Sequence, residues 1–157
     1  MFKDMLSIPY VCPAGVVSMK FRDITGNAKN KYLGLPGSRP KLFNARVLAE
    51  PIDTVVLCEG ELDAIVMSAR VGVPAVGVPG VSAWLDHFPR CFADVRNVFV
   101  VFDNDVHEDG SNPGQVAVKK VLKAIPHARN ILPPKGLDVS EWFVSQGAGV
   151  IRKAMGL

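Results

Sequence analysis

The sequence has few cysteines and no long apolar run. Its cysteines are Cys12, Cys58 and Cys91, and no Cys-x-x-Cys pair occurs. An odd, widely spaced set of cysteines argues against a disulfide framework and against a cysteine-rich zinc site, and it is compatible with a reducing cytoplasm. No apolar stretch approaches the roughly 20 residues that span a bilayer, and the amino terminus lacks the apolar core of a signal peptide. We therefore expect a cytoplasmic protein with no membrane partner.

The charged residues are segregated along the chain, although the net charge is only +3. Residues 1–50 carry eight lysines and arginines against three acids, whereas residues 51–100 carry three arginines against six acids. An enzyme that holds polyanions next to metal-binding carboxylates needs such a basic segment beside an acidic one. A solvated, charged surface loop would also account for so modest an excess.

Alternating strand-like and helix-like segments predict an α/β fold. Hydrophobic residues make up 48% of the 157 residues and charged residues 21%, which is enough to bury an ordinary core in one domain. Short apolar runs predict strands, which we place at residues 54–58, 74–78, 98–102 and 128–132. Apolar residues at helical spacing predict helices, at residues 62–71, 115–125 and 140–145. This alternation indicates a mostly parallel sheet flanked by helices, after a leading segment of short strands and turns.

Two of the predicted strands end in acidic residues. Glu59 and Gly60 follow the first strand, and Asp103, Asn104 and Asp105 follow the third. Ligands of open parallel sheets bind at the carboxyl ends of the strands, and carboxylates gathered there are costly unless a cation pairs with them. Each motif alone is usually a turn or a solvated loop. Together, on βα units of one short chain, they predict a site for a hard divalent cation.

Glu59-Gly60 and Asp103-x-Asp105 at two strand ends resemble the signature of the TOPRIM fold. That fold is shared by bacterial and phage DNA primases, type IA and type II topoisomerases, RecR-type recombination proteins and several nucleases. The resemblance covers about residues 53–146. Residues 57–64, with an acid four residues after the glutamate, are especially similar to the primase version.

The resemblance implies a role for each acidic residue. Glu59 would be the general acid or base. Asp103 and Asp105 would hold Mg²⁺ or Mn²⁺, with Asp63 and Asp138 as auxiliary acids around a second ion. From the residues alone, Asp63 could instead lie on an exposed helix face, and Asp138 could be the N-cap of the last helix.

The loop after Asp105 is longer than in many members of the family. Residues 106–113 separate the acids from the next predicted helix and add His107, Glu108 and Asp109. These side chains could be further metal ligands, but a solvated loop accounts for them better.

The basic leading segment resembles the segment that precedes TOPRIM in DnaG-type and phage primases. Lys31 lies in a Lys-Tyr-Leu motif whose lysine contacts nucleotide phosphates in that family, and Arg22 would contact phosphate or template. With Lys41 and Arg46 they form a candidate set of phosphate-contacting side chains. Each of the four, taken alone, is more often an ordinary surface residue.

The resemblance as a whole implies the catalytic core of a primase. Such a core is a nucleotidyltransferase that makes short RNA primers on single-stranded DNA from ribonucleoside triphosphates, and it works with a zinc-binding primase module and a replicative helicase. Neither of those modules is visible in the sequence, so they would sit on other chains or be absent. A TOPRIM nuclease and a non-catalytic RecR-like nucleic-acid-binding subunit remain alternatives.

The same resemblance suggests how the chain is divided. Residues 1–50 would be a small basic N-terminal subdomain, residues 53–146 the TOPRIM domain, and residues 147–157 a C-terminal tail. If the chain is phage-encoded, the cytoplasm in which it works is that of the bacterial host.

Overall fold

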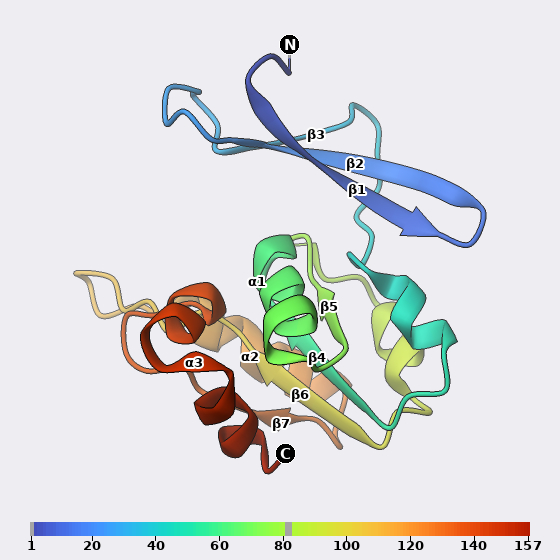
Figure 1. Ribbon diagram of the computed structural model, residues 1–157, viewed down its shortest axis with the longest axis vertical. Helices are drawn as coiled ribbons and strands as arrows, with labels where there is room; N and C mark the ends of the chain where they lie inside the picture. The colour runs from blue at the N-terminus through green and yellow to red at the C-terminus, as the bar shows by residue number, and fades with distance from the viewer. Residues whose placement is uncertain (1, 81–82) are drawn as a thin grey trace.

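The structure is a computed structural model that describes residues 2–80 and 83–157, and it contains two sheets (Figure 1). The first is antiparallel, in the order β1-β2-β3, with strands Met5–Cys12, Gly15–Asp23 and Tyr32–Gly34. The second is parallel, in the order β5-β4-β6-β7. Its strands, from β4 to β7, are Thr54–Cys58, Ala75–Gly77, Asn97–Val101 and Arg129–Asn130. The predicted α/β fold with a mostly parallel sheet is confirmed.

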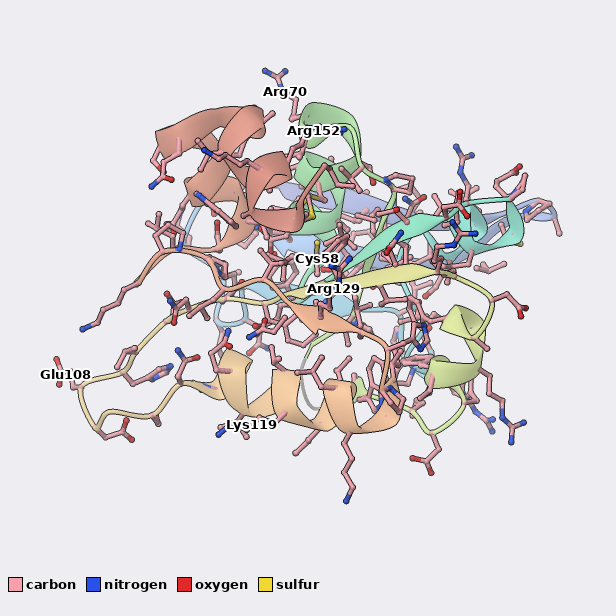
Figure 2. The ribbon with its side chains drawn as sticks, turned by 90° about the horizontal axis from the view of Figure 1, so that it is seen from below. Cys58, Arg70, Glu108, Lys119, Arg129 and Arg152 are labelled. Carbon is pink, nitrogen blue, oxygen red and sulfur yellow. The ribbon has the colours of Figure 1, made fainter. Side chains whose placement is uncertain are left out.

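Helices cover both faces of the parallel sheet (Figure 2). One face carries α2 (Pro113–Ala124) and the 3₁₀ helix η4 (Phe88–Phe92). The other carries α1 (Glu61–Val66), its π-helical continuation η2 (Met67–Val71) and α3 (Val139–Met155). A further 3₁₀ helix, η1 (Ala45–Ala49), links the two sheets. Among the described residues, no helix is long and apolar enough to cross a membrane.

The central strands are apolar throughout because both faces of the sheet are buried. In β4, Val55 and Leu57 pack toward α2 and η4, whereas Val56 and Cys58 pack toward α1 and α3. All four side chains are fully buried. Successive strand residues point to opposite faces, so a strand covered on both sides reads as a continuous apolar run, as the sequence showed.

The leading segment joins the parallel sheet through the backbone. The N–H of Phe43 donates to the carbonyl of Gly77 over 2.8 Å, and the N–H of Gly77 donates back over 3.2 Å. The Asn44 side-chain amide donates to the carbonyl of Ala75 over 2.9 Å. These bonds hold the end of the leading segment against β5, at the edge of the sheet.

The last helix is longer than predicted. We expected a helix at residues 140–145 and a tail from 147, but α3 runs to Met155 and ends at Gly156, which takes the left-handed conformation. Gly147 interrupts it with φ 78° and ψ 170°, which is a kink and not an end. Ile151 and Met155 lie four residues apart and are buried, so residues 147–155 are held by packing against the core.

We expect Ile151→Ala to destabilise the protein by about 2–5 kcal/mol, because it would open a cavity beneath α3. Val150→Ala is the matched control, since the Val150 side chain is 44% exposed, and its cost should stay within about 0.5 kcal/mol. Urea unfolding measures both values. Equal, small effects would mean that residues 147–155 do not contribute to the core.

Candidate functional site

A cleft of about 530 Å³ lies between the antiparallel sheet and the carboxyl ends of the parallel strands. Four side chains from β2, β3 and the loop between them line one wall: Lys20, Arg22, Lys31 and Tyr32. Acidic side chains from the ends of β4 and β6 and from the starts of α1 and α3 line the other: Glu59, Glu61, Asp63, Asp103 and Asp138. The cleft therefore sets a basic wall against an acidic one.

The parallel pairing of β4 and β6 brings the two acidic motifs together. Cys58 pairs with Val101, so both strands end at the same edge of the sheet. Glu59 Oε2 accepts a hydrogen bond from the Asp103 N–H over 3.3 Å. Asp103 Oδ1 is buried and has no hydrogen-bond partner within the part of the chain that the structure describes. A buried carboxylate oxygen without a donor is unfavourable unless a cation supplies the missing charge.

The carboxyl groups of this cluster raise one another's pKa values, in addition to the effect of burial. Burial, followed by the charges of Glu59, Asp63, Asp138 and Asp105, raises the pKa of Asp103 to about 8. Burial and the charge of Asp138 raise the pKa of Asp63 to about 6, although hydrogen bonds from Ser140 oppose the shift. Burial also raises the pKa of Glu59. The cluster has more acidic groups than positive charge to balance them.

The structure contradicts one of the two interpretations of Asp63, the exposed helix face. Its side chain is only 9% exposed, so it does not lie on a solvent-facing helix surface. Its Oδ1 accepts hydrogen bonds from the Ser140 hydroxyl at 2.9 Å and from the Ser140 N–H at 3.3 Å. Asp63 therefore ties the start of α1 to the start of α3 at the edge of the cleft.

Asp138 has two roles, because it caps the start of α3 and also lines the cleft. Its side chain accepts a hydrogen bond from the Glu141 N–H over 2.7 Å, and Glu141 Oε2 accepts one from the Asp138 N–H over 3.2 Å. This reciprocal pair is a capping box at the start of α3. The cap is therefore present, and it holds the carboxylate among the other acids.

Asp105 is exposed and does not line the cleft, although its charge reaches Glu59 and Asp103. The residue between the two acids, Asn104, is buried. Its Nδ2 donates to the Pro133 carbonyl over 2.8 Å, and its Oδ1 accepts from Asn112 Nδ2 over 3.0 Å. Asn104 thus anchors the loop after β6, a role that its position in the sequence did not reveal.

The loop after Asp105 satisfies its own polar groups. The His107 N–H donates to the Ser111 carbonyl over 2.9 Å, and Asp109 Oδ1 accepts from the Ser111 N–H over 2.8 Å. Glu108 lies at the far end of the loop, away from the sheet (Figure 2). The solvated-loop interpretation fits this geometry.

The donor set suits a hard divalent cation. Carboxylate oxygens are the ligands that Mg²⁺ and Mn²⁺ prefer, and the cluster contains a buried oxygen without a partner. As they stand, no three or more acidic, histidine or cysteine side chains among the described residues converge as a complete metal site. Asp103 would hold such an ion, with Asp63, Asp105 and Asp138 supplying further charge around it and Glu59 beside it as the candidate acid or base.

The basic wall contains two of the four basic residues that the sequence proposed. Arg22 Nη1 donates to the Tyr32 hydroxyl over 2.8 Å, and Lys31 is exposed at the cleft. Lys41 and Arg46 do not line the cleft: Lys41 Nζ donates to the Arg39 carbonyl over 3.4 Å, and Arg46 is exposed in η1.

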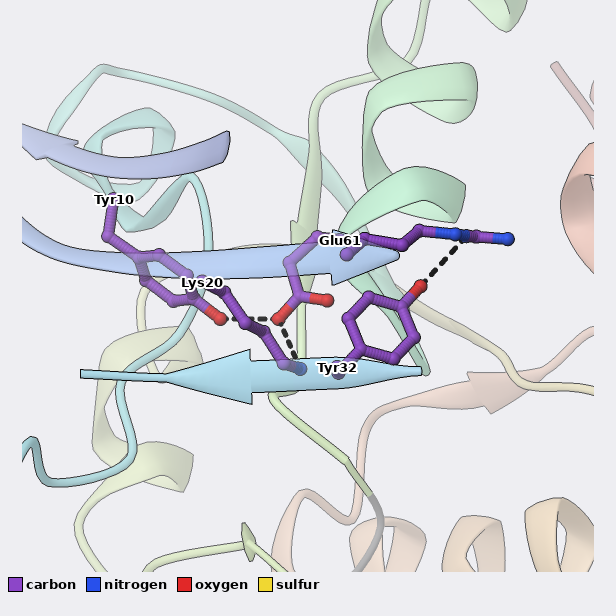
Figure 3. A network of polar contacts seen from close by, with 5 residues as sticks. Tyr10, Lys20, Tyr32 and Glu61 are labelled. Carbon is purple, nitrogen blue, oxygen red and sulfur yellow. Dashed lines mark hydrogen bonds and ion pairs between the residues drawn. The ribbon is translucent and has the colours of Figure 1, made fainter. Parts of the chain in front are cut away.

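A buried polar network joins the two walls (Figure 3). Glu61 Oε1 accepts hydrogen bonds from the Tyr10 hydroxyl and from Lys20 Nζ, the latter over 2.8 Å. Burial and the neighbouring Glu61 raise the pKa of Tyr10, which stays a neutral donor. These three residues could not be singled out from the sequence, because Lys20 and Tyr10 lie 41 and 51 positions from Glu61.

We expect Mn²⁺ affinity to rise as the pH is raised from about 6 to 8, because the ion must displace the proton of Asp103. The stability of the metal-free protein should change with pH in the opposite direction. Folding raises the pKa of Asp103 and Asp63, so stability of the metal-free protein is fullest in acid and falls as the pH rises toward 8. Calorimetric titration and thermal unfolding across this range measure both, and Asp103→Asn should flatten the upper part of each curve.

We expect Gly114→Ala to weaken Mn²⁺ binding at least about tenfold. A Cβ atom at Gly114 would lie 2.5 Å from the Asp103 carbonyl oxygen and 2.9 Å from Glu59 Oε2, so both acids must move. Gly149→Ala is the matched control, because a Cβ there meets nothing within 4 Å. Metal titrations in which the two variants agree would contradict the assigned site.

No family model matches the chain. It is 36% identical over 152 residues to the Gene 57 protein of Mycobacterium phage D29, an alignment that covers 94% of this chain and 95% of that protein. It is 26% identical over 166 residues to the DNA primase of Thermotoga maritima, covering 98% of this chain and 28% of the primase. The chain thus spans little more than a quarter of that primase.

The fold matches solved primase structures. The zinc-binding and RNA polymerase domains of the Aquifex aeolicus primase superpose with a TM-score of 0.80 at 20% identity, covering 99% of this chain and 40% of the primase chain. This coverage includes the antiparallel sheet as well as the parallel one. The chain therefore belongs to the family of the mycobacteriophage D29 Gene 57 protein, and it has the TOPRIM-containing fold of DnaG-type and phage primase catalytic cores.

Proposed function

We propose that this protein is the catalytic core of a primase, a nucleotidyltransferase that joins ribonucleotides on a single-stranded DNA template. The proposal rests on one observation: a basic wall and a carboxylate cluster face each other across one cleft. Ribonucleoside triphosphates carry the dense negative charge that the basic wall suits, and their reaction requires charge neutralisation that the carboxylates can provide through a divalent ion.

Each side chain in the cleft has a proposed role in this reaction. Lys31 and Arg22 contact phosphates, and the Tyr32 hydroxyl holds the Arg22 guanidinium in place. Glu59 accepts the proton of the attacking 3′-hydroxyl, for which its raised pKa suits it. Asp103, with Asp105 nearby, would hold Mg²⁺ or Mn²⁺. When bound, the ion would neutralise the charge that develops on the transferred phosphate.

Template recognition is proposed to come from other chains. The Aquifex aeolicus structure contains a zinc-binding domain beside its polymerase domain. In the present sequence the three cysteines differ in setting, since Cys58 is buried and Cys91 is exposed, and they offer too few thiolates for a Cys₄ site. A separate zinc-binding module and a replicative helicase are therefore the partners to test, alongside single-stranded DNA.

We expect primer synthesis on single-stranded DNA with Mg²⁺ or Mn²⁺ to be weak for this chain alone and raised by a zinc-binding primase module, which would position the template. Asp103→Asn and Glu59→Gln should each abolish both the basal and the raised rate, and Lys31→Ala should raise the KM for nucleotide. Glu108→Gln is the control, because that acid lies at the far end of the solvated loop, away from the sheet (Figure 2), and does not line the cleft. Incorporation of labelled nucleotides measures all four.

Two other results would contradict the proposal. Cleavage of DNA or RNA without incorporation, with the module present, would make the protein a TOPRIM nuclease that uses the same acids. Salt-dependent DNA binding without either reaction would make it a RecR-like binding subunit. In that binding assay, log K should fall with log salt by about 0.7 for each phosphate neutralised on a single strand.

A further inference from the structure

Glu61 is an ionisable residue in an almost completely buried position, with 1% of its side chain exposed. One of its oxygens, Oε1, accepts hydrogen bonds from both Tyr10 and Lys20. Within residues 2–80 and 83–157, its contact with Lys20 is the only ion pair. The pair connects the antiparallel sheet to the first turn of α1, so the one buried charge pair of the described chain lies at the junction of the two sheets.

The place of Glu61 on α1 separates it from the metal-facing acids. Glu59 precedes the helix and bonds to the backbone of Asp103, while Asp63 bonds to Ser140 at the start of α3. The Glu61 side chain, between them in sequence, accepts its hydrogen bonds from Tyr10 of β1 and Lys20 of β2. One short segment, residues 59–63, therefore carries part of the acidic wall and the attachment point of the basic wall.

Lys20 extends this attachment to the residues proposed to contact phosphate. Its Nζ lies 4.8 Å from the centre of the Tyr32 ring, and the Tyr32 hydroxyl accepts a hydrogen bond from Arg22. Lys20 and Arg22 are two residues apart on β2, and Arg22 pairs with Tyr32 across the sheet. A chain of contacts thus runs from Glu61 through Lys20 and Tyr32 to Arg22 (Figure 3).

The charge of Lys20 is already balanced. Glu61 neutralises it at 2.8 Å, and the ammonium is partly covered, with 21% of the side chain exposed. Lys31, at the same cleft, is exposed and has no such partner among the described residues. The ammonium of Lys31 can therefore bind a phosphate, whereas that of Lys20 is already paired with Glu61. Lys20 instead contacts Glu61 and Tyr32 and so affects how these side chains are arranged.

We propose that Lys20 and Glu61 are positioning residues that set the basic wall, above all Arg22, at a fixed place opposite the carboxylate cluster. The inference rests on the proposed nucleotide-binding function of the cleft. A buried ion pair contributes little net stability compared with apolar residues of similar size. Apolar side chains at positions 20 and 61 could not replace the hydrogen bonds that Glu61 accepts from Lys20 and Tyr10. They could not replace the contact of the Lys20 ammonium with the Tyr32 ring either.

The test compares nucleotide affinity with stability in matched variants. Lys20→Met should weaken the binding of a fluorescent ATP analogue in Mg²⁺ by about tenfold or more, as expected when binding groups lose their alignment. Lys20→Arg, which keeps the charge and the donor, should retain most of the affinity. Lys29→Met removes an exposed lysine of the same segment and should change the affinity less than about twofold.

The double variant Lys20→Met with Glu61→Met separates positioning from stability. Because the double variant removes both buried charges, its melting temperature should lie closer to the wild-type value than that of Lys20→Met, which leaves the Glu61 charge without its partner. Its nucleotide affinity should stay as low as that of Lys20→Met. Hydrogen exchange at the β2 amides should be faster in both Lys20 variants that carry Met, whether or not nucleotide is present. Mn²⁺ affinity should change less than about twofold, since the carboxylate cluster is left intact.

The inference is overturned if the double variant regains nucleotide affinity together with stability, or if Lys20→Met binds nucleotide as the Lys29→Met control does. Unchanged exchange at β2 would overturn it as well. A wild-type protein that binds Mn²⁺ but no nucleotide would refute the proposed function, and the inference would fall with it. Should the double variant with Glu61→Met fail to fold, Glu61→Gln replaces Glu61→Met, because it removes the charge and keeps a side-chain oxygen that can accept from the Tyr10 hydroxyl.

Discussion

The mutual repulsion of carboxylates at one edge of the parallel sheet is the constraint on which the rest of this structure depends. Strand pairing places Glu59 beside Asp103, and helix starts bring Asp63 and Asp138 to the same cleft. Neighbouring basic residues cancel this charge only in part, because Lys20 pairs with Glu61 and the charge of Arg22 only partly opposes the raised pKa of Asp63. The acids are thus left for a cation, while Lys31 and Arg22 remain at the opposite wall for a polyanion.

The two walls are held in different ways, and this matters for function. The acidic wall rises from a sheet whose central strands are buried on both faces, so its position is fixed by the core. The antiparallel sheet is attached mainly by the Phe43–Gly77 backbone bonds and by the network at Glu61. Small movements of the basic wall therefore cost less than movements of the acids, which makes its attachment points the places where cleft geometry is set.

The sequence predicted those parts of the structure that have a local pattern. Apolar β-branched runs marked the strands, and acids after them marked the site, because strand ends of a parallel sheet meet at one edge. The length of α3 was missed: the predicted helix ended at residue 145, whereas packing of Ile151 carries the helix past the kink at Gly147. The Glu61 network could not be predicted, because contacts between distant charged residues leave no periodicity.

Two glycines show why close backbone approach is equally hard to read from sequence. A Cβ at Gly77 would lie 2.7 Å from the Gly60 carbonyl oxygen, and one at Gly114 would lie 2.5 Å from that of Asp103. Neither glycine has a positive φ, so the requirement is for space and not for an unusual backbone conformation. Because these positions lack a side chain, the end of β5 can approach the turn between β4 and α1, and the start of α2 can approach the acidic end of β6. The carboxylate cluster therefore requires glycine at positions 77 and 114 as well as the acidic residues themselves.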